Sequence, residues 1–495
     1  MIQRSIITTI AALTIGGVSS AAYAQTSPTN AARAATQTPS TITTVAAAKP
    51  TPTPTPSLTS PGTLPGAPMA LPSAAPGATA TPVALSLQDA KMVAVQRSPQ
   101  LELARAALDL ASGQLEVANS AALPGINASA SFGRSKAPIR SGGVVSTGLF
   151  TTNNGSINLS QLIFDGGSTY AKMSEARWSR DAASLNALRA IDQVLFNVAQ
   201  DYYSALQARY QYQVAIESRK LAEEQEKLVE AQFRAGVASR ADVLTAQLPV
   251  AQARLTEAQA ANGEQTQIAL LLNAMGLPSD TPVNLTAEAA QTVPPLPAFG
   301  TVLSIAQAQR SDLQAANASY TAASRGLRAA RASRFPAISA VASTGTATTS
   351  VANGMLATNG GNYTNTYNFG AVASMPIFNS GLTSGLIKEA EANERSAQAA
   401  LVNSQLGVSL SVRQAYLGAL TAVQQVDASK AELDQAQTVL DVTNAQYKAG
   451  VTTLILLLQS QVSLTKARGD YVNALFGAYT AQQNLLFAEG TIANH

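Results

Sequence analysis

The stretch AQFRAGVASRADVLTAQ at residues 231–247 has a near copy, AQYKAGVTTLILLLQSQ, at residues 445–461. The two stretches are 214 residues apart (445 − 231), and each places a glycine inside a long helical pattern. Glycine at such a point is typical of a helix end, because it tolerates the positive φ that terminates many helices. The two copies therefore indicate two helical hairpins of the same kind in one chain.

The glycine turns belong to a larger duplication. LIFDGG at 162–167 matches PIFNSG at 376–381, and Gly276 matches Gly490, all at the same offset of 214 residues. An offset of this size indicates a duplicated half rather than a short solenoid repeat. We predict a first repeat over residues 83–300 and a second over 301–490.

The residues before the first repeat have a different character. Residues 1–24 resemble a secretory signal peptide, with a positive charge at Arg4, an apolar core and a small-x-small cleavage site at Ala22-Tyr23-Ala24. A short membrane anchor is the alternative. Residues 25–82 are rich in Pro, Thr and Ala, and we expect a disordered arm that serves as a tether or as a partner-binding segment.

Each half contains two stretches in which apolar and polar residues alternate, which is the period of a β-strand. They are INASASF (126–132), INLSQLI (157–163), ISAVAST (338–344) and FGAVASMPI (369–377). We expect polar loops between them, at 134–154 and 346–367. Four strands with free edges cannot stand alone in lipid, so several chains must close one membrane β-barrel, with lipid outside and water inside.

The remaining segments of each half have a helical pattern rich in Ala, Gln, Glu and Leu. Val426, Leu433 and Leu440 lie seven residues apart, which is coiled-coil spacing. The expected helices cover 85–122, 168–235, 239–275, 301–335, 382–449 and 453–489. The longest would extend roughly 100 Å at 1.5 Å per residue. The predicted fold is mainly α, with tandem-duplicated coiled-coil hairpins and four barrel strands per protomer, and the polar helices belong in the periplasm.

The composition excludes several kinds of chemistry. The chain has no cysteine, and its only histidine is the last residue, His495. Thiolate nucleophiles and Cys or His metal sites are therefore not expected. The net charge of +3 is spread without a basic block, which argues against nucleic-acid binding. We expect no enzyme activity, no cofactor and no metal.

The duplicated helix–strand–strand–helix order and the paired turns FRAGVASRADVL and YKAGVTTLILLL resemble the TolC-type outer-membrane efflux protein family. The resemblance implies a homotrimer that forms one outer-membrane barrel, in contact with lipid, and a long periplasmic tunnel. It also implies docking onto a periplasmic adaptor (membrane fusion) protein and an inner-membrane pump, as the exit duct of a tripartite efflux or type I secretion system. Drugs, metals, oligosaccharides and proteins remain open as substrates.

In this family the helical tips act as an iris held closed by polar links. The resemblance implies that Asp242 and Tyr447 form one such link. The simpler interpretations are that Asp242 forms a capping box with Ser239, and that Tyr447 continues the apolar stripe of residues 426–440.

The second tip departs from the family pattern. Thr452 stands where the family has a gate arginine, and Leu456 and Gln459 stand where it has paired aspartates. The run Leu454–Leu458 either packs between helices or supplies a ring of leucines that gates by dewetting.

The tip turns are the expected adaptor-docking surface, with plain helix capping as the alternative interpretation. The candidate docking residues are Gly236, Val237, Ser239, Gly450, Val451 and Thr452.

The leading functional hypothesis is a passive duct coupled to a separate pump. The alternative is a trimeric outer-membrane fibre or adhesin without conduction. The Ala- and Gln-rich helices and the repeated tips favour a hollow tube, since a fibre would have a fully apolar seam.

Overall fold

A computed structural model describes residues 83–141, 143–286, 295–353, 356–357 and 362–494, which belong to one compact unit. The signal peptide predicted at 1–24 and the arm predicted at 25–82 lie outside the described residues.

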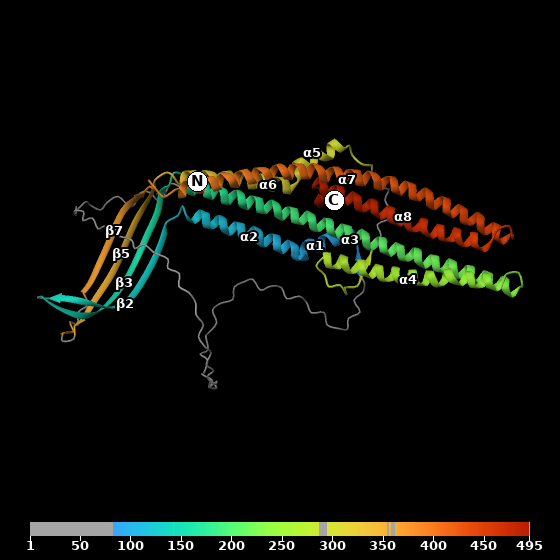
Figure 1. Cartoon of the computed structure of the whole chain (residues 1–495), viewed down its shortest axis with the longest axis horizontal. Coiled ribbons are helices and arrows are strands. Elements are labelled where there is room, and N and C mark those ends of the chain that lie inside the picture. Colours follow the sequence, from blue (N-terminus) through green and yellow to red (C-terminus); the bar gives the residue numbers. More distant parts are fainter. Residues whose placement is uncertain (1–82, 142, 287–294, 354–355, 358–361, 495) are drawn as a thin grey trace, which may run out of the picture. The chain divides into compact units, whose positions relative to one another are not determined.

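Two long helical hairpins dominate the described part of the chain (Figure 1). The outgoing helices α3 (Ser168–Arg234) and α7 (Leu382–Lys448) each contain 67 residues. They return as α4 (Arg240–Ala274) and α8 (Leu454–Glu489). These bounds agree with the sequence prediction to within one residue at each end, because glycine turns and caps fix where the helices stop.

The other two predicted helices, 85–122 and 301–335, are each broken, and the prediction of single helices was wrong. The first divides into α1 (Leu87–Arg97) and α2 (Pro99–Ser120), and the second into α5 (Phe299–Gln309) and α6 (Ser311–Ala332). Ser98 has ψ 123°, as expected for a residue that proline excludes from the helical region. Arg310 has ψ 118° without a following proline, so its conformation depends on tertiary contacts.

Those contacts form a buried charged cluster at the break between α5 and α6. The Arg310 guanidinium donates to Asp312 Oδ2 at 2.5 Å and to the Ser411 hydroxyl of α7 at 2.7 Å. Arg189 of α3 lies 3.7 Å from Asp312 and stacks over the Phe487 ring of α8 at 3.8 Å. Burial opposes ionisation of Asp312, but the two arginines outweigh it and lower its pKa. The cluster ties four helices together.

The long strands form one antiparallel sheet in the order β2-β3-β5-β7 (Figure 1). Their bounds are β2 Gly125–Ser141, β3 Val144–Phe164, β5 Ala337–Asn353 and β7 Asn362–Ser374, and the short β6 (Leu356–Ala357) pairs with β5. The predicted polar loops at 134–154 and 346–367 are therefore wrong, since most of these residues are paired. Thr151 pairs with Ser350 and Thr152 with Thr349. Polar residues can form these strands because the hydrogen bonds of the ladder join backbone groups and do not depend on the side chain. Threonine, in addition, favours the strand conformation.

The register places apolar and polar side chains on opposite faces of the sheet. Ile126, Leu159, Ala342 and Phe369 lie side by side in one row of the ladder. The next residues along each strand, Asn127, Asn158, Ser343 and Asn368, form the adjacent row on the other face. Because paired residues share a face and successive residues alternate, the predicted apolar and polar faces are confirmed.

A small parallel pair outside this sheet escaped the sequence analysis. β1 (Val83–Leu85) pairs with β4 (Val283–Leu285), beside the core of α1 and α3. The buried Tyr202 hydroxyl lies 3.1 Å from the Leu85 carbonyl and 2.7 Å from that of Thr286. Each strand has only three residues, too few to show a period. Of the helices described here, none has the length and apolar character needed to span a membrane.

Candidate functional site

The two hairpin tips have the same backbone turn. Gly236 and Gly450 have φ 75° and 73°, the left-handed conformation that favours glycine. The N–H of Gly236 donates to the Phe233 carbonyl at 3.0 Å, and that of Val237 to the Gln232 carbonyl at 2.9 Å. The second tip has the equivalent bonds from Gly450 to Tyr447 and from Val451 to Gln446. This pair of bonds is the Schellman motif, which uses carbonyls that the helix end leaves unpaired.

The return helices begin with different caps. In the first hairpin the Asp242 N–H donates to Ser239 Oγ at 3.2 Å, and the Ser239 N–H donates to Asp242 Oδ2 at 2.8 Å. This is the predicted capping box. The hydrogen bonds from the Ser239 hydroxyl and backbone lower the pKa of Asp242. In the second hairpin Thr453 caps the Leu456 N–H at 3.4 Å, and leucine occupies the position of the aspartate.

The two hairpins are joined at the tips by a polar contact. The Tyr447 hydroxyl donates to Gln232 Oε1 on α3 at 2.8 Å. The hydrogen-bond partner is thus Gln232, while the Asp242 carboxylate bonds to Ser239. Burial and, secondly, the Asp242 charge raise the pKa of Tyr447. The structure therefore brings Asp242 and Tyr447 close enough for electrostatic interaction. The hydrogen bond of the Tyr447 hydroxyl, however, is with Gln232 and not with Asp242.

The leucine run of the second tip divides by exposure. Leu454 and Leu458 pack with Val229 and Ala246 of the first hairpin. Leu457 is completely buried in a separate cluster with Leu440 and Leu464, and Leu221 and Leu433 pack against it. Leu456 is 50% exposed, and Ile455 is also exposed. Most of the run therefore packs, and Leu456 remains available on the surface of this protomer.

The predicted docking residues lie at the outer ends of the hairpins. Val237 and Val451 are 79% and 76% exposed. Gly236, Gly450 and Ser239 are exposed, and Thr452 is half-buried. Gln459, one turn into α8, is exposed as well. The turns thus present small and apolar groups to the surroundings, and the exposed Arg234, Arg240 and Lys448 flank them.

Gln232 was missed at the sequence level, although the repeat contained a signal. The first tip has Phe233 where the second has Tyr447 (447 − 214 = 233). A hydroxyl present in only one copy indicates a contact that the two copies do not share, although its partner Gln232 is itself repeated as Gln446 (446 − 214 = 232). The residue that satisfies it lies in the other copy, so only the packing of the hairpins identifies it.

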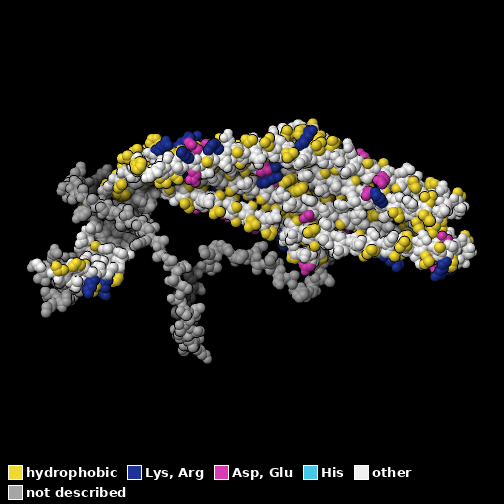
Figure 2. Space-filling model, viewed as in Figure 1, with side chains coloured by type: hydrophobic (Ala, Val, Ile, Leu, Met, Phe, Trp, Pro, Cys, Tyr) yellow, Lys and Arg dark blue, Asp and Glu magenta, His cyan; other side chains and the backbone are white. Residues whose placement is uncertain are grey.

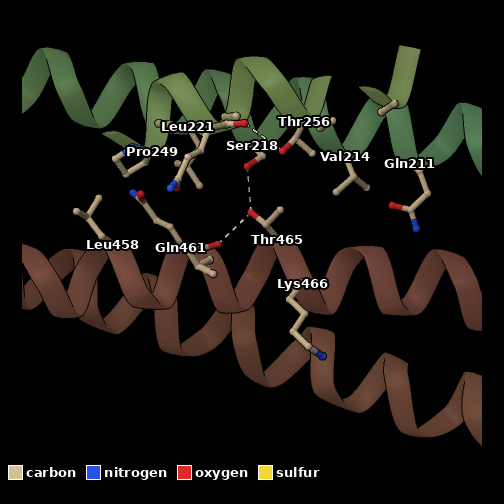
Figure 3. Close-up of a pocket in the computed structure, with 16 residues that line it drawn as sticks. Gln211, Val214, Ser218, Leu221, Pro249, Thr256, Leu458, Gln461, Thr465 and Lys466 are labelled. Atoms are coloured by element: carbon tan, nitrogen blue, oxygen red, sulfur yellow. Dashed lines mark hydrogen bonds between the residues drawn. The ribbon is translucent and has the colours of Figure 1, made fainter. Parts of the chain in front are cut away.

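Farther from the tips, a cavity of 390 Å³ separates the first hairpin from α8 (Figure 3). Pro249 of α4, Leu458 of α8 and Leu221 of α3 contribute to its walls. The Thr465 hydroxyl donates to Ser218 across the gap at 3.3 Å, as Figure 3 shows. The contact between the hairpins is therefore looser here than at a close-packed helix interface.

Comparison with known proteins gives the same picture. The family described as outer membrane efflux protein matches residues 92–277 and 302–491. The outer membrane protein TolC of Escherichia coli (strain K12) is 24% identical over 403 residues, 80% of each chain. Protein CyaE of Bordetella pertussis (strain Tohama I) is 27% identical over 411 residues, 82% of this chain and 84% of that protein. The crystal structure of the Campylobacter jejuni CmeC outer membrane channel shares the fold, with a TM-score of 0.68, 20% identity and coverage of 82% and 85% of the two chains.

The fold and the family agree with each other. The family match covers both repeats and includes both tips. The mainly helical fold with duplicated hairpins and four long strands is confirmed, and the location is the outer membrane with a periplasmic helical part. The chain therefore belongs to the outer membrane efflux protein family, whose members are non-enzymatic channels for efflux.

Proposed function

We propose that three copies of this chain assemble into one hollow duct through which substrates leave the periplasm passively. The observation that carries the proposal is the open sheet with one apolar and one polar face. In the described part of the sheet, β2 and β7 end the strand order, and each pairs along one edge only. Lipid does not satisfy a free strand edge, so closure with further copies is required.

The faces of the sheet define the inside and outside of this duct. Asn127, Asn158, Ser343 and Asn368 would face the lumen, where water solvates them. Ile126, Leu159 and Phe369 would face lipid. A lumen of uncharged amide and hydroxyl groups has weak selectivity, so substrate choice belongs to a separate pump.

The exposed tips are the surface that we assign to a periplasmic adaptor protein. Val237 and Val451 occupy equivalent positions beyond the two glycine turns and are both largely exposed. Because the two hairpins end in the same turn with a valine at the same position, they present a partner with the same element twice. The adaptor would connect the duct to an inner-membrane pump, in a tripartite efflux or type I secretion assembly.

The same tips supply a gate in this proposal. The Tyr447–Gln232 bond holds the two hairpins together at the tip, and Asp242 adds a charge nearby. The 390 Å³ cavity lies farther from the tip, so opening at the tip separates mainly the apolar contacts of Leu454 with Val229 and Ala246. Leu456, with Gln459 one turn away, would line the constriction, where apolar side chains exclude water and ions.

Electron microscopy of the purified protein in detergent tests the assembly. We expect a hollow particle with three-fold symmetry, a detergent belt at one end and a taper at the other. A solid rod would reject the duct and support the fibre instead.

Docking is tested separately, because the chain contains no cysteine and any introduced cysteine is unique. Val237→Cys and Val451→Cys carry a photoactivated cross-linker, and Leu103→Cys on α2, which is 73% exposed, is the matched control. We expect both tip variants to cross-link to the adaptor and the control not to do so. Equal cross-linking at all three positions would contradict docking at the tips.

A further inference from the structure

The charge of the sheet is concentrated in one strand. The four long strands contain no Asp or Glu, and their only charged residues, Arg134, Lys136 and Arg140, are all in β2. Figure 2 shows Lys and Arg side chains gathered at the end of the sheet farther from the helices. The described side chains, Arg134 and Lys136, are both exposed. The two cations therefore have no carboxylate partner within the four long strands.

The register places these two residues on the apolar face. Phe132 pairs with Asn153, which pairs with Thr348, which pairs with Tyr363, so the two aromatic residues lie in one row. Arg134 and Lys136 follow Phe132 at two-residue steps and therefore share its face. The hydrogen bond from Arg134 Nε to Thr151 Oγ1, at 3.4 Å, lies on the same face, because Arg134 and Thr151 are paired.

Below these residues, the same face of β7 is mainly apolar, with Asn365 as its one amide, and it has about the height of a hydrocarbon layer. From Ala373 to Tyr363, β7 advances ten residues (373 − 363), or about 33 Å along the strand at ~3.3 Å per residue. With a tilt of about 40°, this corresponds to roughly 25 Å along the membrane normal, the height of the apolar band of outer-membrane barrels. The row of Phe132 and Tyr363 is thus at the position of an aromatic girdle.

The two basic residues lie just beyond that girdle. Arg134 is one row and Lys136 two rows farther, or about 5 and 10 Å higher with the same rise and tilt. The headgroup layer adds roughly 5 to 7 Å on each side of the hydrocarbon core. Since β2 starts directly after α2 on the periplasmic side, Arg134 and Lys136 lie on the outer side of the membrane.

We propose that Arg134 and Lys136 form a binding site for the phosphate groups of outer-leaflet lipid. A guanidinium binds phosphate with two parallel hydrogen bonds, and a lysine on a long stem reaches the same layer from the strand. The site is continuous with the lipid-facing band, which favours lipid over a polypeptide partner. In the same two rows of the ladder, β5 of the second repeat has the uncharged Ser350 and Ala352. Each protomer therefore has one such site.

Native mass spectrometry of the full-length assembly with lipid A, and with phosphatidylcholine for comparison, tests the site. Each charge removed should weaken lipid A binding roughly five-fold, so Arg134→Gln/Lys136→Gln should weaken it about 25-fold per site. Lys220→Gln/Lys227→Gln removes the same charge from exposed positions of α3 and should leave lipid A binding unchanged.

The conservative variant Arg134→Lys/Lys136→Arg keeps both charges and should retain lipid A binding. If the double glutamine variant does not assemble, Lys136→Gln alone gives the same test with the smaller, five-fold effect. Equal lipid A binding by the wild type and the glutamine variant would overturn the proposal. An equal loss in the α3 control would overturn it too, because binding would then follow net charge alone.

Discussion

Removing the Tyr447 hydroxyl should destabilise the closed state of the duct. Tyr447→Phe deletes the 2.8 Å hydrogen bond to Gln232 and makes the second tip chemically like the first, which has Phe233 at this position. The ring still packs against the cluster of Val229, Ala246 and Leu454, so apolar packing is retained. The variant therefore isolates one polar contact between the two hairpins.

The expected magnitude follows from the number of copies. One such hydrogen bond contributes about 1 kcal/mol, because Gln232 is half-buried and regains water when it is lost. If three protomers open together, the closed state loses about 3 kcal/mol, which corresponds to roughly two orders of magnitude in the closed-to-open ratio. We expect a large increase in the basal conductance of single channels in planar bilayers.

Two further variants make the result specific. Tyr170→Phe removes a hydroxyl from a side chain that is 74% exposed at the start of α3, and it should leave conductance unchanged. Gln232→Leu removes the acceptor and should have the same effect as Tyr447→Phe, while the double variant should add little. Unchanged basal conductance in Tyr447→Phe, or full additivity in the double variant, would refute a gate held by this bond.

Three other predictions concern the same tips. Leu456→Asp should raise basal leak and cation preference in planar bilayers, since it replaces a half-exposed apolar group with a charge; an unchanged ion selectivity would assign Leu456 to packing. Leu457→Ala should destabilise the hairpins by about 2 to 5 kcal/mol, because this side chain is fully buried. Thermal melting followed by circular dichroism should show a lower melting temperature for Leu457→Ala, whereas Leu456→Ala should melt like the wild type. The pKa of Asp242 is lowered by its bonds to Ser239, so the capping box stabilises the tip above the usual carboxyl pKa, and this contribution is lost as the pH falls through the lowered value. In the wild type, hydrogen exchange of the first turn of α4, corrected for intrinsic rates, should show that protection falls as the pH is lowered. An equally large fall in protection in Asp242→Asn, which has no carboxyl to titrate, would contradict a stabilising role of this carboxylate.

The sequence by itself determined the elements whose signals are local and repeated. The glycines at 236 and 450 mark helix ends because their positive φ is a property of the residue and its neighbours. The capping box of Ser239 and Asp242 spans three residues, so spacing alone predicts it. Alternation in INASASF assigns the apolar face correctly, because the side-chain period of a strand is two.

Tertiary structure decided what depends on residues far apart in the chain. The break at Arg310 has no proline and follows from a buried guanidinium that Ser411 and Asp312 satisfy. The polar residues 134–141 and 144–154 are strand because their backbones pair, and the side-chain pattern carries no signal for that pairing. Tyr447 bonds to Gln232, 215 residues away, since the two hairpins lie side by side with their tips at the same end. Local chemistry determines where each helix and turn forms, and only the packed chain brings their side chains together.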